Sequence, residues 1–162
     1  FRLAFEATSH FAAIGAVIAS HPNPSECDEP TAPLSVLIMN GTEDPLIPYD
    51  GGCVANNACR RGSVASTDET LQFWIENNDA SQSPVINIFP DTDTRDGSTV
   101  TSYTYADGLR DTEVVLYKVD GGGHTVPGEE PIGAAARLVV GPKNRDINGA
   151  DEIWAFFERH QR

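Results

Sequence analysis

Three long apolar runs dominate the pattern of hydrophobic and polar positions along the chain. They are IGAVIAS at 14–20, LSVLIMNG at 34–41 and EVVLYKVDG at 113–121. Continuous apolar runs of this length are typical of strands that are buried on both faces, as in parallel sheets. The second run closes with an Asn-Gly pair and the third with glycine, and both predict a turn. The pattern therefore predicts buried strands at these three places.

Helical spacing of apolar residues marks two further segments in the first half of the chain. Residues 1–9 have the pattern of a helix that ends there, with an apolar face formed by Phe1, Ala4, Phe5 and Thr8. A second helix is predicted after Ser66, because Ser66 and Glu69 have the spacing of a capping box. The apolar stripe that follows consists of Leu71, Trp74 and Ile75.

The last predicted helix begins at Asn148, and acidic residues occupy its first turn, where they favour the helix dipole. Its buried face is predicted to comprise Ala150, Ile153, Trp154 and Phe157. Residues 84–105 predict a β-hairpin, with VINIF and TVTSYTY on either side of an Asp-Gly turn at 96–97. Buried strands separated by helices predict an α/β protein with a mainly parallel sheet flanked by helices. Residues 1–162 then form part of a single domain.

The charge balance narrows the choice of partners. The chain has 24 acidic and 11 basic residues, a formal net charge of −13. Such a surface repels phosphate backbones and anionic lipid, so we expect neither nucleic acid nor a membrane as a partner. No apolar run approaches the roughly 18 residues of a membrane-spanning helix. The chain starts without methionine, in what looks like the middle of a fold, so the absence of a targeting segment excludes nothing.

The three cysteines give information about the redox environment of the protein. Cys53 and Cys59 flank a short loop and could form a disulfide, which would suggest an oxidising environment. Cys27 is then left over, or pairs with a cysteine elsewhere. No two cysteines have C-x-x-C spacing, so a structural zinc site is not expected. The segment PDTDTRDG at 90–97 has some features of a calcium loop. However, Arg95 stands where an oxygen ligand belongs, and a solvated hairpin turn is the preferred interpretation.

Two titratable residues follow the ends of predicted strands. Asp44 comes just after the Asn-Gly pair, and His124 follows three consecutive glycines in VDGGGHTVPG. If the strands are parallel, both loops open at the same edge of the sheet, where α/β proteins bind ligands. A carboxylate that accepts the Nδ1–H of an imidazole fixes its tautomer for acyl transfer. The glycines allow backbone conformations through which the ring could reach inward. Taken separately, an aspartate at this place is most often a turn residue and a histidine beside glycines is usually a loop residue, and only the pair makes a functional interpretation as good.

Four segments of the sequence resemble a known protein family. They are VLIMNGTEDPLIPYDGG, TLQFWIENN, VVLYKVDGGGHTVPG and DINGADEIWAFFERH. Together they resemble the C-terminal half of the polyhydroxybutyrate depolymerase-like esterases, a group of α/β-hydrolases that is also similar to feruloyl and acetyl-xylan esterases. The likeness runs in order through the whole chain. It implies that Asp44 and His124 belong to a Ser-Asp-His catalytic triad, in the chain order of α/β-hydrolases. It implies no metal and no organic cofactor, and it favours a secreted or periplasmic location.

Two substitutions depart from the family pattern. Val126 stands where the family usually has tryptophan, and the resemblance places this position at the substrate-binding cleft. We therefore expect an altered or roomier acyl or aryl site. Asn40 stands where histidine is common, and we expect that change to be benign.

The nucleophilic serine is the larger departure. In the family it lies in a G-x-S-x-G elbow that leads into the helix beginning here with FRLA, and this sequence contains no such motif. Ser63 follows one glycine but no apolar strand, and Ser20 lacks the glycines of a sharp turn. The chain therefore resembles the part of an esterase that supplies Asp44 and His124 only, and it is expected to be inactive alone. Its nucleophile would lie elsewhere in a longer polypeptide or on a separate chain.

The expected substrate is an ester, either a polyester or an acylated or feruloylated polysaccharide. Two other hypotheses stay open at this stage. One is a non-catalytic protein that binds a polysaccharide or polyester on a degenerate esterase scaffold. The other is a homo-oligomer in which two copies complete each other's sheet, because a half sheet exposes an apolar edge.

Overall fold

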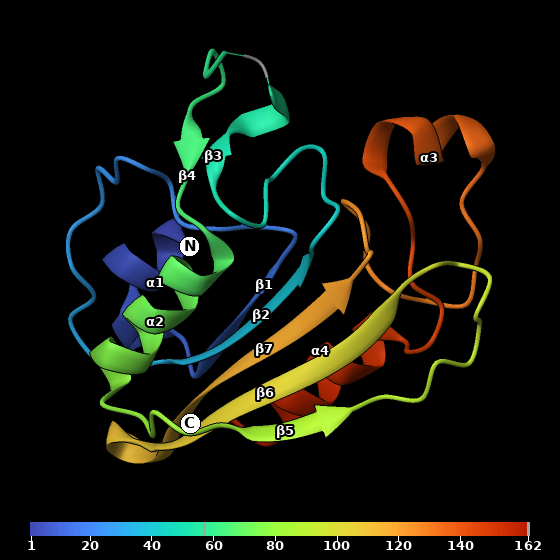
Figure 1. Cartoon of the computed structure of the whole chain (residues 1–162). Coiled ribbons are helices and arrows are strands. Elements are labelled where there is room, and N and C mark those ends of the chain that lie inside the picture. The colour runs from blue at the N-terminus through green and yellow to red at the C-terminus, as the bar shows by residue number, and fades with distance from the viewer. Residues whose placement is uncertain (57, 162) are drawn as a thin grey trace.

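The fold is built on a five-stranded sheet (Figure 1). The computed structural model describes residues 1–56 and 58–161. The strand order is β1-β2-β7-β6-β5. The strand bounds are β1 Ala13–Val17, β2 Ser35–Gly41, β5 Val85–Ile88, β6 Thr99–Gly108 and β7 Thr112–Asp120. Strands β1, β2 and β7 are parallel, whereas β6 is antiparallel to β7 and β5 is antiparallel to β6. The sheet is therefore mixed, and its parallel part contains the three predicted apolar runs.

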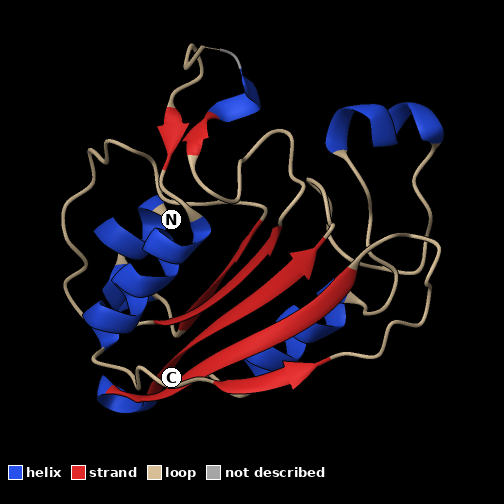
Figure 2. Cartoon of the chain, viewed as in Figure 1, coloured by secondary structure: helices blue, strands red, loops and turns tan. Residues whose placement is uncertain are grey.

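Helices lie on both faces of this sheet (Figure 2). Their bounds are α1 Arg2–Glu6, α2 Thr67–Asn78, α3 Ala134–Val140 and α4 Gly149–Glu158. Helices α1 and α2 cover one face and α4 covers the other, whereas α3 stands away from the sheet. A small second sheet pairs β3 Gly52–Cys53 with β4 Ser63–Val64. Short 3₁₀ turns span Thr8–His10, Val54–Asn56 and Leu109–Asp111. Within the described residues, no helix is long and apolar enough to cross a membrane.

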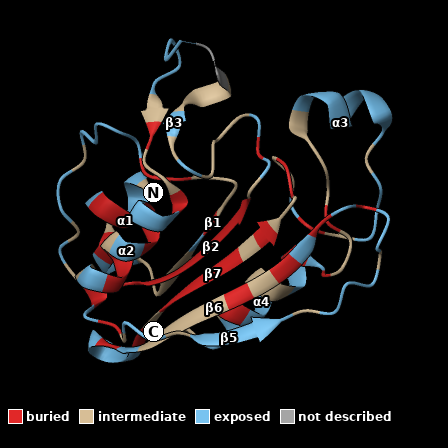
Figure 3. Cartoon of the chain, viewed as in Figure 1, coloured by how far each residue is buried: buried red, intermediate tan, exposed pale blue. Residues whose placement is uncertain are grey.

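Strands β2 and β7 are the centre of the hydrophobic core (Figure 3). Successive side chains of a strand point to opposite faces, so each strand contributes to two clusters. Val36, Ile38, Val114 and Leu116 pack with the helices α1 and α2, around Trp74 and Ile75. On the other face, Leu37, Met39, Val115, Tyr117 and Val119 pack with Phe156 of α4. Because β2 and β7 are buried on both faces, polar and apolar residues do not alternate along these two runs.

Helix α2 is held to the sheet at both ends by buried asparagines. At its C-terminal end, Asn78 accepts a hydrogen bond from the backbone N–H of Leu34 (3.0 Å) and donates one to its carbonyl (2.8 Å). At its N-terminal end, Asn40 of β2 donates to the hydroxyl of Thr67 (3.0 Å). The predicted capping box of Ser66 and Glu69 is present. Asn40 also exchanges two hydrogen bonds with the backbone of Ala19, so it joins β2 to α2 and to the segment that follows β1.

Two predictions about burial were wrong in part. The first strand ends at Val17, and most of its residues are only half-buried, because among the described residues β1 has a neighbouring strand on one side only. In α4, Ala150 and Trp154 are exposed, whereas Phe156 is fully buried with Ile153 and Phe157 packed beside it. Gly149, one turn before Ile153, also faces the sheet, since a Cβ there would lie 3.1 Å from Sδ of Met39.

A buried histidine makes the stability of this fold sensitive to pH. His21 lies among Phe1, Phe5, Phe73 and Trp74, and its Nε2 accepts a hydrogen bond from the indole Nε1–H of Trp74 (2.9 Å). Burial lowers the pKa of His21 from 6.5 to about 4, since the charged imidazolium would lose its hydration. Above pH 6.5 the ring is neutral in both states, so its contribution to stability is fully present. Below that pH the unfolded chain binds the proton first, and this contribution is lost progressively down to about pH 4.

We predict that His21→Gln flattens this part of the pH dependence, because glutamine offers Trp74 an acceptor but does not titrate. The effect amounts to at most about 3 kcal/mol, since one pKa unit corresponds to about 1.4 kcal/mol. Urea unfolding at about pH 7 and about pH 4.5 measures the difference for each variant. His10→Gln is the matched control, because His10 is exposed. An equal change in the free energy of unfolding between the two pH values for the wild type and His21→Gln would contradict the prediction.

Candidate active site

The loops that follow β2 and β7 are joined by hydrogen bonds beyond the end of the sheet. The backbone N–H of Thr42 donates to the carbonyl of Val119 (3.0 Å), and that of Glu43 donates to the carbonyl of Gly122 (2.8 Å). In return, the N–H of Gly121 donates to the hydroxyl of Thr42 (2.8 Å). Because β2 and β7 are parallel, these loops leave the same edge of the sheet, and the bonds hold them side by side.

Gly41 is required by this close approach. A Cβ atom at Gly41 would lie 2.3 Å from the carbonyl oxygen of Gly122. The expected Asn-Gly turn is not formed, because Asn40 and Gly41 are the last two residues of β2 and pair with Lys118 and Val119. The glycine serves to bring two backbones together rather than to reverse the chain.

Asp44 lies in the loop after β2, and its carboxylate is held by backbone donors. Its Oδ1 accepts hydrogen bonds from the N–H groups of Leu46 (2.7 Å) and Ile47 (2.8 Å). Its Oδ2 lies 2.8 Å from Nδ1 of His124, and the side chain of Asp44 is only 2% exposed. Asp44 is thus both the turn residue and the partner of the histidine, since each oxygen serves one of these roles.

The main chain of the His124 loop is fixed by a second segment, residues 140–142. The N–H of His124 donates to the carbonyl of Val140 (2.6 Å), and that of Gly123 donates to the carbonyl of Pro142 (2.8 Å). Of the three consecutive glycines, only Gly121 has a positive φ, of 77°. Gly123 is needed for space instead, because a Cβ atom there would lie 2.2 Å from the carbonyl oxygen of Val140.

This geometry determines which nitrogen of His124 is available. An ionised carboxylate can only accept, so Nδ1 donates its proton to Asp44, and Nε2 keeps its lone pair. Among the described residues, Nε2 has no hydrogen-bond partner, and 25% of the His124 side chain is exposed. The imidazole is therefore oriented by a buried carboxylate, and its accessible nitrogen can accept a proton.

Val126 lies close to this histidine in sequence but packs toward helix α4. Its side chain is 39% exposed, and its Cγ1 lies 2.9 Å from the position that a Cβ of Gly149 would occupy. It lines a hollow of about 360 Å³ together with Pro127, Gly128, Lys143 and Asn148, among others. There is thus open space on one side of Val126.

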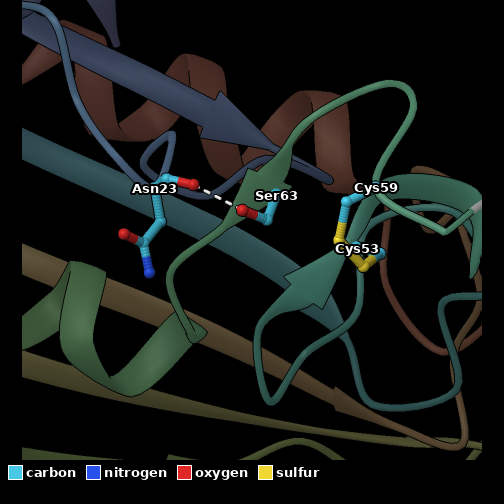
Figure 4. Close-up of a disulfide and its surroundings, with 4 residues drawn as sticks. All are labelled: Asn23, Cys53, Cys59 and Ser63. Atoms are coloured by element: carbon cyan, nitrogen blue, oxygen red, sulfur yellow. Dashed lines mark hydrogen bonds between the residues drawn. A yellow bond between two sulfur atoms is a disulfide. The ribbon is translucent and has the colours of Figure 1, made fainter.

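Neither alternative serine is joined to the histidine. Ser63 begins β4, and its hydroxyl donates to the backbone carbonyl of Asn23 (Figure 4). Ser20 is buried, and its hydroxyl accepts from Asn40 at 3.5 Å. Within the described part of the chain, no serine hydroxyl forms a hydrogen bond with His124. Cys53 and Cys59 form a disulfide beside Ser63, and Cys27 is free.

The described residues contain no group of three or more His, Cys, Asp or Glu side chains that could hold a metal ion. In the segment 90–97, Asp93 accepts hydrogen bonds from Arg95 and Arg145. Asp96 accepts from the N–H and hydroxyl of Ser98 and from the N–H of Arg145.

Sequence patterns missed the segment that supports His124. Helix α3 and the residues after it were not predicted, although the run AAARLVV contains good helix formers. The carbonyls of Val140 and Pro142 give no sequence pattern of their own, because any residue offers a carbonyl. The expectation that Asn40 is benign stays a prediction, and in the structure its buried amide bonds to the backbone of Ala19 and to the hydroxyl of Thr67.

Replacing Gly123 with alanine tests the packing that fixes the histidine. We predict that Gly123→Ala destabilises the fold by about 1–3 kcal/mol, because the added methyl group overlaps the carbonyl of Val140 and forces the two loops apart. Chemical denaturation measures this loss. Gly128→Ala is the control in the same loop, since the nearest atom to its Cβ would be Nζ of the flexible Lys143 at 3.5 Å. An equal effect of the two substitutions would refute this account of Gly123.

One comparison with known proteins finds a relative that is named as an esterase. No family model matches the chain. The curated protein named "Putative esterase NocK", from Nocardia uniformis subsp. tsuyamanensis, is 32% identical over 157 residues. The alignment covers 93% of this chain and 44% of the relative, so the chain spans less than half of the relative's length. The similarity supports an esterase-like relationship over nearly the whole chain.

Proposed function

We propose that this chain supplies the aspartate and histidine of a serine carboxylic-ester hydrolase. The observation that carries the proposal is the 2.8 Å contact between Nδ1 of His124 and the buried Oδ2 of Asp44, at the carboxyl ends of two parallel strands. The similarity to an esterase-named protein supports the same class of reaction. The order of aspartate before histidine is that of α/β-hydrolases.

The proposed mechanism assigns one role to each atom of the pair. Nε2 of His124 takes the proton from a serine hydroxyl as its oxygen attacks the ester carbonyl. The proton then passes to the leaving alcohol, and the acyl group stays on the serine. A water molecule then attacks the carbonyl carbon of this acyl-enzyme and gives a proton to Nε2. Nε2 returns this proton to the serine oxygen as the acyl–oxygen bond breaks, which releases the carboxylic acid and restores the serine hydroxyl. Asp44 holds the ring and stabilises the imidazolium, and the N–H groups of Leu46 and Ile47 keep its carboxylate in place.

The proposal also covers the place of the serine, the type of esterase and the location of the protein. We assign the serine to a segment outside residues 1–162, in the same polypeptide or on another chain, that packs along β1. The half-buried residues of β1 support this, since β1 has a neighbouring strand on one side only among the described residues. The motif GGGHTVPG supports an esterase of the polyhydroxybutyrate depolymerase or feruloyl esterase type. The Cys53–Cys59 disulfide supports a secreted or periplasmic location.

A serine-reactive fluorophosphonate tests the triad directly in the active protein purified from its source. We predict that mass spectrometry places the label on a peptide outside residues 1–162. His124→Ala should abolish labelling and lower kcat/KM for ester hydrolysis by about 10⁴-fold or more. His10→Ala is the control, since it removes an exposed imidazole elsewhere. A label on Ser20 or Ser63, or no label at all, would contradict the assignment, and the second result would favour a polymer-binding protein.

Val126 is proposed to line the acyl or aryl site next to His124. Because one side of Val126 faces an open hollow, a larger side chain can enter that space. We predict that Val126→Trp in the active enzyme changes the ranking of kcat/KM between acetyl and feruloyl esters, and that Val126→Ile changes it less. Thermal unfolding checks that both variants are folded. An unchanged ranking in folded Val126→Trp would remove Val126 from the substrate site.

A further inference from the structure

Four basic side chains of this acidic chain line one hollow, which we call the basic hollow. It has a volume of about 320 Å³ and is lined by Asp93, Arg95, Asp96, Pro131, Ile132, Arg137, Lys143 and Arg145. The hollow thus contains four of the chain's 11 basic residues but only two of its 24 acidic residues. The local balance is opposite to that of the whole surface, which has a net charge of −13.

The two carboxylates of the basic hollow are already occupied. Asp93 accepts from Nε of Arg95 (3.1 Å) and from Nη1 of Arg145 (2.6 Å). These partners lower the pKa of Asp93, with the hydrogen bond from Arg95 as the main cause, so the carboxylate is ionised at neutral pH. Asp96 is 7% exposed, and both of its oxygens accept hydrogen bonds from Ser98 or Arg145. Asp93 is thus ion-paired with two arginines, whereas the partners of Asp96 are neutral donors that satisfy its oxygens without cancelling its charge.

Arg137 and Lys143 are the cations that remain. Among the described residues, neither forms an ion pair with a carboxylate. Nη2 of Arg137 donates only to the backbone carbonyl of Asp96, at 3.4 Å, and Nζ of Lys143 donates to the backbone carbonyl of Glu130, at 2.9 Å. In a chain with a large excess of acid, two cations without carboxylate partners in one hollow leave free donors for an anion from outside.

The basic hollow is connected to the Asp44–His124 site through the chain itself. Arg137 belongs to α3, which ends at Val140, and Lys143 directly follows Pro142. The carbonyls of Val140 and Pro142 accept the hydrogen bonds that fix His124 and Gly123. A third contact comes from the β5–β6 loop, since a Cβ on Gly121 would lie 2.4 Å from the carbonyl of Gly97. The walls of the hollow and the supports of the histidine are therefore the same two loops.

We propose that the basic hollow binds a carboxylate carried by the substrate, so that the ester hydrolysed at His124 belongs to an acidic polysaccharide with uronic acid groups. Arg137 and Lys143 contact the carboxylate, and the guanidinium groups of Arg95 and Arg145 add positive potential. This assignment of the substrate rests on the proposed esterase function, whereas binding of the anion does not. The hollow would also offset the repulsion that the acidic surface imposes on an anionic polymer.

The experiment is a calorimetric titration of the protein with trigalacturonate, with neutral xylotriose and with inorganic sulfate. We expect trigalacturonate to bind and xylotriose not to bind. Raising the salt from about 0.01 M to about 0.1 M should weaken the binding, because the Debye length falls from about 30 Å to about 10 Å. Arg137→Gln and Lys143→Gln should each weaken it about tenfold, as expected for loss of one charged hydrogen bond.

Arg2→Gln is the matched control, because it removes the same charge from an exposed arginine of α1 that pairs with Glu6. Circular dichroism confirms that each variant is folded. An equal loss of binding in Arg2→Gln, or no binding of any anion at low salt, would overturn the proposal. Binding of sulfate without trigalacturonate would overturn the polysaccharide assignment. These results are independent of fluorophosphonate labelling, so the esterase proposal and the anion site can fail separately.

Discussion

The hydrogen bonds between the loops after β2 and β7 are the constraint on which the candidate site depends. Thr42 and Glu43 donate to the β7 side, and Gly121 donates back to Thr42, so the ladder of two parallel strands continues past the end of the sheet. Residues separated by 80 positions can meet only because this contact holds their loops together. Gly41 allows the approach, since a side chain there would collide with the neighbouring backbone. The helices on both faces stabilise the same pair of strands through their alternating side chains.

Asp44 shows that a structural and a chemical role can reside in one carboxylate. Its Oδ1 organises the turn, and its Oδ2 faces His124. The turn bonds also orient the second oxygen, because a carboxylate held by two backbone donors cannot rotate freely. The hydrogen bonds that make Asp44 a turn residue therefore also hold its carboxylate in place against His124. Buried hydrogen-bonded groups of this kind are stable only when every partner is satisfied.

The segment 133–142, which contains α3, contacts both the His124 loop and the basic hollow. Its end supports the backbone of His124, and α3 within it stands away from the sheet (Figure 1). Arg137 within this segment and Lys143 just after it line the basic hollow, and among the described residues neither forms an ion pair with a carboxylate. In the proposed enzyme, one loop would thus position the general base and recognise the charge of the polymer. Coupling of this kind would place the ester near His124 whenever a uronic carboxylate occupies the hollow.

The sequence by itself determined the buried strands β2 and β7, the capping box of α2, the start of α4 and the positions of Asp44 and His124 beyond the ends of two parallel strands. Each of these rests on local information, namely continuous apolar runs, cap residues and turn residues at strand ends. Only the tertiary structure decided that β1 is a half-buried edge, that Phe156 rather than Trp154 faces the core, and that α3 supports the histidine. It also placed Arg137 and Lys143 in one hollow. These features depend on which segments of the backbone lie side by side. The sequence gives no sign of such contacts where they are made by backbone carbonyls, as at Val140 and Pro142, because every residue has a carbonyl group.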